Sequence, residues 1–233
     1  MEIDFWHERW REGRIGFHQP ETNRMLLRHW ERLAGAAGAG TNIFVPLCGK
    51  SLDMVWLAGA QNEADAARSR SIIGVDVSPI AIRQFFEERG AGNDVTIETS
   101  GAFEIHRWSC WELWCGDFFA FPPARLANTE LAYDRASLIA LPPSMRERYA
   151  RQLAAMLPPR ARTLLITLGY DQSEMDGPPF SVPVDEVVAL FAPYRHVEHI
   201  ETKDTLSGDA RMRERGLSRL ETHVFVIGAA HSA

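Results

Sequence analysis

Apolar residues along this chain fall into short runs that alternate with longer segments of mixed polarity. The short runs, rich in Ile, Val and Leu, are typical of buried strands, and they lie at residues 42–47, 72–77, 131–135, 163–168, 196–200 and 222–227. Residues 103–108 and 111–114 predict a pair of short strands. Apolar residues at helical spacing predict helices at residues 51–59, 79–89, 142–157 and 185–191. This alternation predicts an α/β fold with a mostly parallel sheet that helices cover on both faces.

The residues before the first strand have a different pattern. Residues 4–13 predict a short capped amphipathic helix, and a second helix is expected at residues 21–33. At 233 residues, the chain has the length at which an α/β fold commonly forms one unit. We therefore expect a single domain, in which residues 1–40 form a helical lid or extension and residues 41–233 form the sheet core.

Two segments lack the pattern of a strand or of a helix. Residues 35–40 consist of glycine and alanine and are expected to form a flexible break. Residues 60–70 become polar, with charges of both signs, and are expected to form an exposed insertion or an extended helix end.

The composition narrows the class of protein. A formal net charge of -6 argues against a nucleic-acid partner, because phosphate backbones attract basic surfaces. No apolar run approaches the roughly 18 residues that span a bilayer, and no signal-peptide pattern opens the chain, so no membrane association is expected. The cysteines, Cys48, Cys110 and Cys115, have no metal-ligand spacing and favour a reducing compartment. We expect a cytoplasmic monomer.

The most informative chemical feature is Asp76, which follows the apolar residues 72–75. Ser78 and Pro79 come next and predict the N-cap and the first residue of a helix. The carboxylate is therefore expected at the carboxyl end of a parallel strand, where doubly wound folds bind ligands and where an acid can accept hydrogen bonds from both hydroxyls of a ribose. The sequence predicts a cofactor that contains adenosine.

The turn after the first strand lacks two familiar phosphate-binding motifs. Cys48-Gly49-Lys50-Ser51 matches the end of a P-loop, but Phe44 stands where that motif needs its first glycine. Gly49 alone also fails the Gly-x-Gly-x-x-Gly pattern of a nicotinamide-dependent dehydrogenase, an alternative that binding of a nicotinamide cofactor would favour. The histidines show no metal-ligand spacing, so no metal site is predicted.

Nearly the whole chain resembles the thiopurine S-methyltransferases, which are class I S-adenosylmethionine-dependent methyltransferases. The resemblance rests on motifs in the family's order: Phe5-Trp6-His7-Glu8-Arg9-Trp10, Gly16-Phe17-His18-Gln19, residues 44–54, Ile73-Gly74-Val75-Asp76, Tyr133-Asp134-Arg135-Ala136-Ser137-Leu138 and residues 177–183. It implies a doubly wound, mostly parallel Rossmann-like sheet of seven strands. The family usually carries glutamate at the position of Asp76, a side chain longer by one methylene.

The resemblance also implies a site for S-adenosyl-L-methionine and its product, S-adenosyl-L-homocysteine. The cofactor-binding residues that it implies are Trp6, Trp10, Leu47, Gly49, Asp76, Asp117, Phe118 and Arg135. Among these, Trp6 and Trp10 would lie against the methionine and sulfonium end, and Asp76 would hold the ribose. Phe17 matches an aromatic residue near the acceptor pocket.

The acceptor that the resemblance implies is a small aromatic or heterocyclic thiol of the thiopurine type. Because a thiol has a pKa near about 8.5, or lower when heteroaromatic, a thiolate forms near neutral pH without a strong base. His18 and Asp134 are candidates for assisting that deprotonation, and the reaction requires no metal. Bacterial members of the family are associated with methylation of selenium and tellurium compounds, so a selenol is the second hypothesis. A non-catalytic S-adenosylmethionine-binding module is the third, distinguished by binding without turnover.

Overall fold

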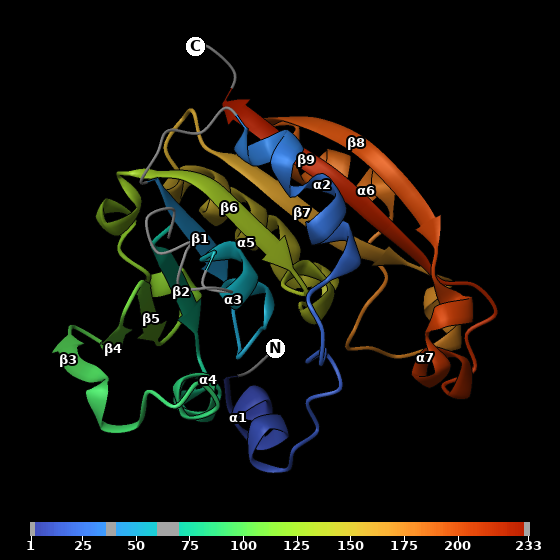
Figure 1. The fold of residues 1–233 in the computed structure, drawn as a ribbon. Coiled ribbons are helices and arrows are strands. Elements are labelled where there is room, and N and C mark those ends of the chain that lie inside the picture. Colours follow the sequence, from blue (N-terminus) through green and yellow to red (C-terminus); the bar gives the residue numbers. More distant parts are fainter. Residues whose placement is uncertain (1–2, 36–40, 60–69, 231–233) are drawn as a thin grey trace. The chain divides into compact units, whose positions relative to one another are not determined.

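The computed structural model describes residues 3–35, 41–59 and 70–230 (Figure 1). The chain forms two compact units, Met1–Tyr133 and Asp134–Ala233. Most of the expected flexible break and of the expected insertion, residues 36–40 and 60–69, lies outside the described residues. No helix in the described ranges has the length and apolar character needed to cross a membrane.

The first unit is built on a sheet whose strands follow the order β3-β4-β5-β2-β1-β6. Its parallel part consists of β1 (Asn42–Pro46), β2 (Ile72–Asp76), β5 (Trp111–Cys115) and β6 (Thr129–Arg135), the last of which ends in the second unit. β1 lies between β2 and β6, and β2 pairs with β5 (Figure 1). Ile43, Phe44 and Val75 are fully buried, as near-continuous apolar runs predict. The loops that follow β1, β2 and β5 therefore meet at one edge of the sheet.

Two antiparallel strands, β3 (Thr96–Ser100) and β4 (Phe103–Trp108), continue this sheet. Two-residue turns join β3 to β4 and β4 to β5, and their first residues, Gly101 and Ser109, have φ angles of 60° and 52°. Such left-handed positions suit tight hairpins. The sequence predicted β4 and β5 but not β3, since every residue of β3 is exposed and the strand has no apolar pattern.

The described helices of the first unit are α1 (Ile3–Arg11), α2 (Arg24–Ala34), α3 (Asp53–Leu57) and α4 (Pro79–Glu87). α4 begins as expected, because the Ser78 hydroxyl accepts a hydrogen bond from the Ala81 N–H at 3.2 Å and Pro79 is its first residue. It contacts β2 and β5. α2 begins at Arg24 instead of residue 21, because the Asn23 side chain caps it. The unit also has short 3-10 helices at Gly92–Asp94, Phe118–Ala120 and Pro123–Leu126.

The second unit contains α5 (Pro143–Met156), β7 (Arg162–Gly169), α6 (Val184–Phe191), β8 (Arg195–Asp204), α7 (Ala210–Glu214) and β9 (Glu221–Ala230). Short 3-10 helices lie at Leu138–Ala140, Gln172–Glu174 and Leu206–Gly208. β9 lies between β7 and β8 and is antiparallel to both. β8 extends beyond its predicted run through Glu201, Thr202, Lys203 and Asp204, which are polar and partly or fully exposed, and β9 extends beyond its run through Glu221 and residues 228–230.

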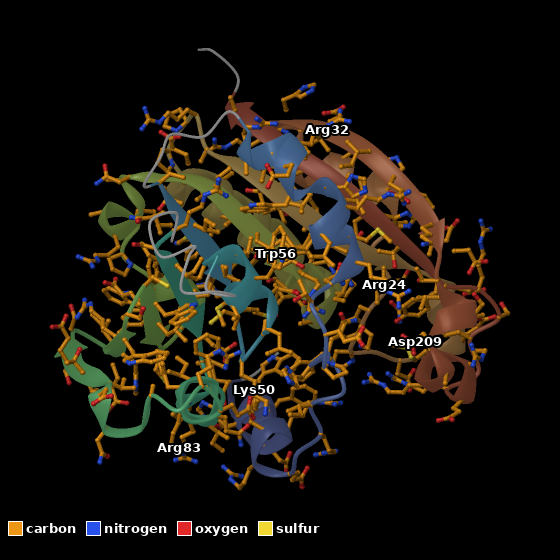
Figure 2. The ribbon with its side chains drawn as sticks, viewed as in Figure 1. Arg24, Arg32, Lys50, Trp56, Arg83 and Asp209 are labelled. Atoms are coloured by element: carbon orange, nitrogen blue, oxygen red, sulfur yellow. The ribbon has the colours of Figure 1, made fainter. Side chains whose placement is uncertain are left out.

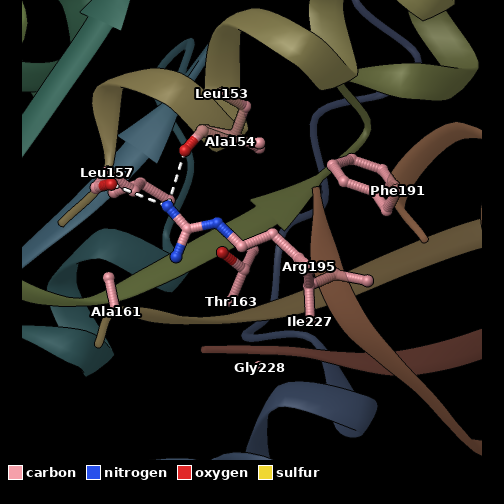
Figure 3. A pocket seen from close by; sticks show the side chains of 9 residues that line it. All are labelled: Leu153, Ala154, Leu157, Ala161, Thr163, Phe191, Arg195, Ile227 and Gly228. Atoms are coloured by element: carbon pink, nitrogen blue, oxygen red, sulfur yellow. Dashed lines mark hydrogen bonds between the residues drawn. The ribbon is translucent and has the colours of Figure 1, made fainter. Parts of the chain in front are cut away.

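Arg195 connects β8 to the end of α5 (Figure 3). Its guanidinium donates hydrogen bonds to the carbonyl oxygens of Ala154, Leu157, Pro158 and Pro159, over 2.5, 2.7, 3.0 and 2.9 Å. These carbonyls belong to the C-terminal turn of α5 and the residues after it, so the positive charge meets the negative end of the helix dipole. Arg195, Ala154 and Leu157 also line a small pocket. Its other lining residues are Leu153, Ala161, Thr163, Phe191, Ile227 and Gly228.

An ion pair between a buried arginine and a partly exposed glutamate lies beside the Gly-Pro-Pro-Phe loop at residues 177–180. Arg146 of α5 is 1% exposed and donates to Glu186 of α6 at 2.7 Å. The same guanidinium donates to the Ser181 carbonyl at 3.1 Å and lies 5.8 Å from the ring centroid of Phe180. Arg146 therefore links this loop to α5 and, through Glu186, to α6.

The α/β class and the parallel centre of the sheet are confirmed. The strand number is a correction, since the described residues form nine strands and not seven. The sequence pattern missed β3 because that strand buries nothing. The single-domain organisation stays a prediction.

Candidate active site

The carboxylate of Asp76 joins the loops after β1 and β2. Its Oδ2 accepts a hydrogen bond from the Gly49 N–H and its Oδ1 accepts one from the Ser78 N–H, both at 2.8 Å. Burial raises the pKa of Asp76, and these two donors and the nearby His7 oppose the rise. Because a carboxylate oxygen can accept more than one hydrogen bond, each oxygen keeps a position for a further donor.

The turn after β1 has an unusual backbone. Leu47 and Gly49 have φ angles of 45° and 53°, in the left-handed region that favours glycine. A Cβ on Gly49 would lie only 3.3 Å from Cζ2 of Trp10. The Cys48 N–H between them donates to the Val75 carbonyl at 3.0 Å, which holds the turn beside β2. Glycine therefore allows the Trp10 indole to pack directly on the backbone of the turn.

Three aromatic residues of the N-terminal segment, Trp6, Trp10 and Phe17, form a cluster beside this turn. The Phe17 ring packs edge-to-face on Trp6 and on Trp10, with centroid distances of 5.7 and 5.6 Å. Trp10 is buried, and Trp6 and Phe17 are half-buried. His7 Nε2 lies 2.9 Å from the Val77 carbonyl oxygen, so α1 is also attached to the loop after β2.

Two cysteines lie close to Asp76. Cys115 lies opposite Asp76 in the β2–β5 register, and Cys48 lies in the turn after β1. Burial, followed by the charge of Asp76, raises the pKa of the Cys115 thiol to about 12 and that of Cys48 well above its ordinary value. Both therefore stay protonated at neutral pH and are poor nucleophiles.

Asp117 and Phe118 lie in the loop after β5, next to the end of β2. The Gly116 N–H donates to the Asp76 carbonyl at 2.9 Å, which sets this loop beside the carboxylate strand. Asp117 is exposed, and its side chain accepts a hydrogen bond from the Phe119 N–H at 2.9 Å. Phe118 is buried. Asp117 is thus the more accessible of the two for a ligand.

Lys50 belongs to the same turn (Figure 2). Its ammonium donates to the Glu88 carboxylate, just after α4, at 2.5 Å. The lysine of the partial P-loop motif is therefore used inside the unit to connect the turn to α4.

The remaining candidates are His18, Asp134 and Arg135. His18 follows Phe17 in the first unit and is half-buried. Asp134 and Arg135 belong to the second unit. Asp134 is fully buried, accepts a hydrogen bond from the Tyr149 hydroxyl at 2.7 Å, and has a pKa that burial raises to about 6. Full burial prevents direct contact between its carboxylate and a methyl acceptor. Arg135 is half-buried.

Sequence reasoning missed Asp53, the first residue of α3. Its side chain is buried and accepts hydrogen bonds from the Asn23 N–H at 2.8 Å and from the Tyr133 hydroxyl at 2.9 Å. An acid in the first turn of an apolar helix is a recognisable local signal. Its partners lie 30 and 80 residues away in the sequence, and no local pattern indicates them.

The parallel sheet with a carboxylate at the end of β2 defines the fold of class I methyltransferases. The N-methyltransferase NodS from Bradyrhizobium japonicum WM9, solved in complex with S-adenosyl-l-homocysteine, has a TM-score of 0.56 and covers 89% of this chain and 89% of its own. At 15% sequence identity this likeness shows the fold alone.

The model of the family "Thiopurine S-methyltransferase (TPMT)" matches residues 1–230, and the chain belongs to that family. A thiopurine S-methyltransferase of Pseudomonas fluorescens (strain Pf0-1) is 45% identical over 227 residues, which are 97% of this chain and 99% of the relative. One of Methylococcus capsulatus (strain ATCC 33009 / NCIMB 11132 / Bath) is 43% identical over 233 residues, 100% of both chains. The predicted family and methyltransferase class are confirmed, and S-adenosylmethionine is the cofactor of this class.

Proposed function

We propose that the protein transfers the methyl group of S-adenosylmethionine to the sulfur of a small aromatic or heterocyclic thiol of the thiopurine type. The observation that carries the proposal is the Asp76 carboxylate, held by two backbone N–H groups beside the aromatic cluster of Trp6, Trp10 and Phe17. The names of the relatives support the class of acceptor.

The residues of the first unit fit a methyl donor that contains adenosine. Asp76 has an acceptor position left on each oxygen, which matches the two hydroxyls of a ribose. Leu47 and Gly49 would lie beside the amino-acid part, in the turn after β1 where their backbone has left-handed φ angles. Asp117 and Phe118 would lie beside the adenine, and Arg135 would contact the cofactor, as in the family pattern.

The aromatic cluster has a chemical role in this proposal. When bound, S-adenosylmethionine supplies a methyl group activated by a positively charged sulfur. The faces of Trp6 and Trp10 would attract that charge, since aromatic rings bind cations through their quadrupoles. With Phe17 they would exclude water from the reacting atoms. These residues would hold the acceptor thiolate in line with the methyl carbon, so that the electron pair of the carbon–sulfonium bond would remain on the departing thioether sulfur as the new bond forms.

The proton of the acceptor thiol needs no strong base. A heteroaromatic thiol ionises near neutral pH, so the site must mainly align the thiolate with the methyl group. We propose His18, which adjoins Phe17, as the group that assists, with Asp134 restricted to an indirect role by its burial. Cys48 and Cys115 do not compete for the methyl group, because they remain protonated.

The test combines binding with turnover. Titration calorimetry should show binding of S-adenosylmethionine and S-adenosylhomocysteine, and methyl transfer should then be measured on a heteroaromatic thiol, an aliphatic thiol and selenite. We expect the highest kcat/KM on the heteroaromatic thiol. Preference for selenite after its reduction to selenol would support a role in selenium and tellurium detoxification instead.

Two outcomes would contradict the proposal. Binding of S-adenosylmethionine with no turnover on any acceptor would indicate a non-catalytic binding module. Binding of a nicotinamide cofactor in its place would indicate a dehydrogenase. A cytoplasmic location and a monomeric state remain predictions from the composition of the chain.

A further inference from the structure

We infer that Asp53 is a positioning residue that holds the N-terminal segment, residues 3–23, on the loop after β1, an inference that rests on the proposed function. This segment carries Trp6, Trp10 and Phe17. The Asp53 side chain accepts hydrogen bonds from the Asn23 N–H and the Tyr133 hydroxyl. It acts through the backbone of Asn23, at the far end of the segment.

Asp53 is a buried carboxylate that accepts hydrogen bonds from other residues of the first unit. The residue is 1% exposed. Oδ1 accepts from the Asn23 N–H at 2.8 Å, and Oδ2 accepts from the Tyr133 hydroxyl at 2.9 Å. Its own N–H donates to the Ser51 hydroxyl at 3.2 Å. A buried carboxylate needs such donors, and hydrogen bonds to it are stronger than those between neutral groups.

Among the described contacts of the N-terminal segment with the rest of the first unit, three lie at or next to the loops after β1 and β2. His7 contacts the Val77 carbonyl after β2 at 2.9 Å, and Trp10 packs on Gly49. The third attachment is the hydrogen bond from the Asn23 N–H to Asp53. The second and third contacts are made by Gly49 and Asp53, which are four residues apart. The turn that contains Gly49 and the residue that binds the end of the segment are therefore close neighbours in the chain.

In the sequence, the aromatic cluster lies between the contacts of α1 and the contact of Asn23 with Asp53, which is why we assign Asp53 a role in positioning the cluster. Phe17 packs on both tryptophans and lies between the α1 attachment and the Asn23 attachment. Without the Asn23 attachment, the segment would lose one of these contacts, and conformations with the aromatic cluster away from the turn would gain population. The apparent affinity for the cofactor then falls in proportion to the fraction of molecules that keep the aromatic cluster on the turn.

Asn23 offers a matched pair of substitutions that isolates the hydrogen bond. Its side chain caps α2 by accepting from the N–H groups of Met25 and Leu26, and its φ of -62° suits proline. Asn23→Ala removes the cap and keeps the backbone N–H. Asn23→Pro removes the cap and the N–H together. Their difference therefore reports the contact with Asp53.

We expect Asn23→Pro to raise the Kd for S-adenosylhomocysteine by about tenfold over Asn23→Ala, equivalent to about 1.4 kcal/mol. KM for S-adenosylmethionine should rise in parallel, with a smaller change in kcat. Asp53→Leu should show the same loss. Asp53→Asn should restore affinity, because its amide oxygen can accept from the Asn23 N–H and its NH2 can donate to the Tyr133 hydroxyl oxygen.

Equal Kd values for Asn23→Pro and Asn23→Ala would overturn the inference, as would an Asp53→Leu protein that is less stable in urea but binds S-adenosylhomocysteine normally. If Asn23→Pro does not fold, the comparison of Asp53→Leu with Asp53→Asn decides the question. Failure of the wild-type protein to bind S-adenosylhomocysteine would instead reject the proposed function, so the two failures are distinct.

Discussion

Replacing Asp76 by asparagine tests the centre of the site with almost no change in volume. The carboxylate accepts the Gly49 N–H on one oxygen and the Ser78 N–H on the other. Asparagine has one carbonyl oxygen and one NH2 group, so one of these N–H groups would face a donor. The variant therefore loses the negative charge that, in the proposed site, faces the ribose, and it loses one of two hydrogen bonds that shape the turn.

The magnitude follows from the number of hydrogen bonds affected. Hydrogen bonds to a charged group are worth roughly 1.5–3 kcal/mol each, and those to a neutral amide roughly half as much. Weakening both ribose contacts and distorting the turn should reduce binding by about 2–4 kcal/mol, a factor of roughly 30 to 1,000 in Kd. The lost internal bond should lower the free energy of unfolding by about 1–3 kcal/mol.

Calorimetry with S-adenosylhomocysteine measures the first effect, and urea denaturation followed by circular dichroism measures the second. Asp171→Asn is a matched control, since this exposed aspartate accepts the N–H of Ser173, two residues on, at 2.9 Å, as Asp76 does with Ser78 at 2.8 Å. The control should leave the Kd unchanged. A folded Asp76→Asn protein with wild-type affinity would refute the assignment of Asp76 to the ribose.

Two further predictions concern stability. The folded-state pKa of Asp134, about 6, exceeds the ordinary 3.8, so the folded protein binds this proton more tightly and loses stability as pH rises from about 4 to about 6. Asp134→Asn should remove up to about 3 kcal/mol of that decline in urea denaturation, and an unchanged pH profile would count against the assignment. Gly49→Ala should lower the free energy of unfolding by about 1–2 kcal/mol, because its φ is 53° and the new Cβ would lie 3.3 Å from Trp10. Thermal denaturation checks this, and a variant as stable as the wild type would contradict it.

Local patterns were sufficient for the central strands and for the position of Asp76. An apolar run, the Ser78 cap and Pro79 are all contiguous in the sequence, and each acts through its nearest neighbours. The turn at Gly49 was found for the same reason. The aromatic cluster was different, because the roles of its residues followed from the family's motifs and not from periodicity.

Contacts between distant segments could not be predicted. The Asp53 side chain meets donors 30 and 80 residues away, and a carboxylate in a helix gives no sign of which donors it will meet. β3 was missed because backbone pairing with β4 determines it, and its side chains bury nothing. Asp134 was a candidate assisting group at the polar end of a predicted strand, and only the packing around Tyr149 shows its full burial.

The carbonyl oxygens around Arg195 determine how the second unit should respond to added salt. Carbonyl groups carry no formal charge, so salt screens their contacts with Arg195 less than it screens a pair of formal charges. The ion pair of Arg146 with Glu186 is such a pair, and the glutamate side chain is 30% exposed. At high salt, the amide protons at the connection between α5 and β8 should therefore keep their protection from exchange better than those of the loop beside Arg146.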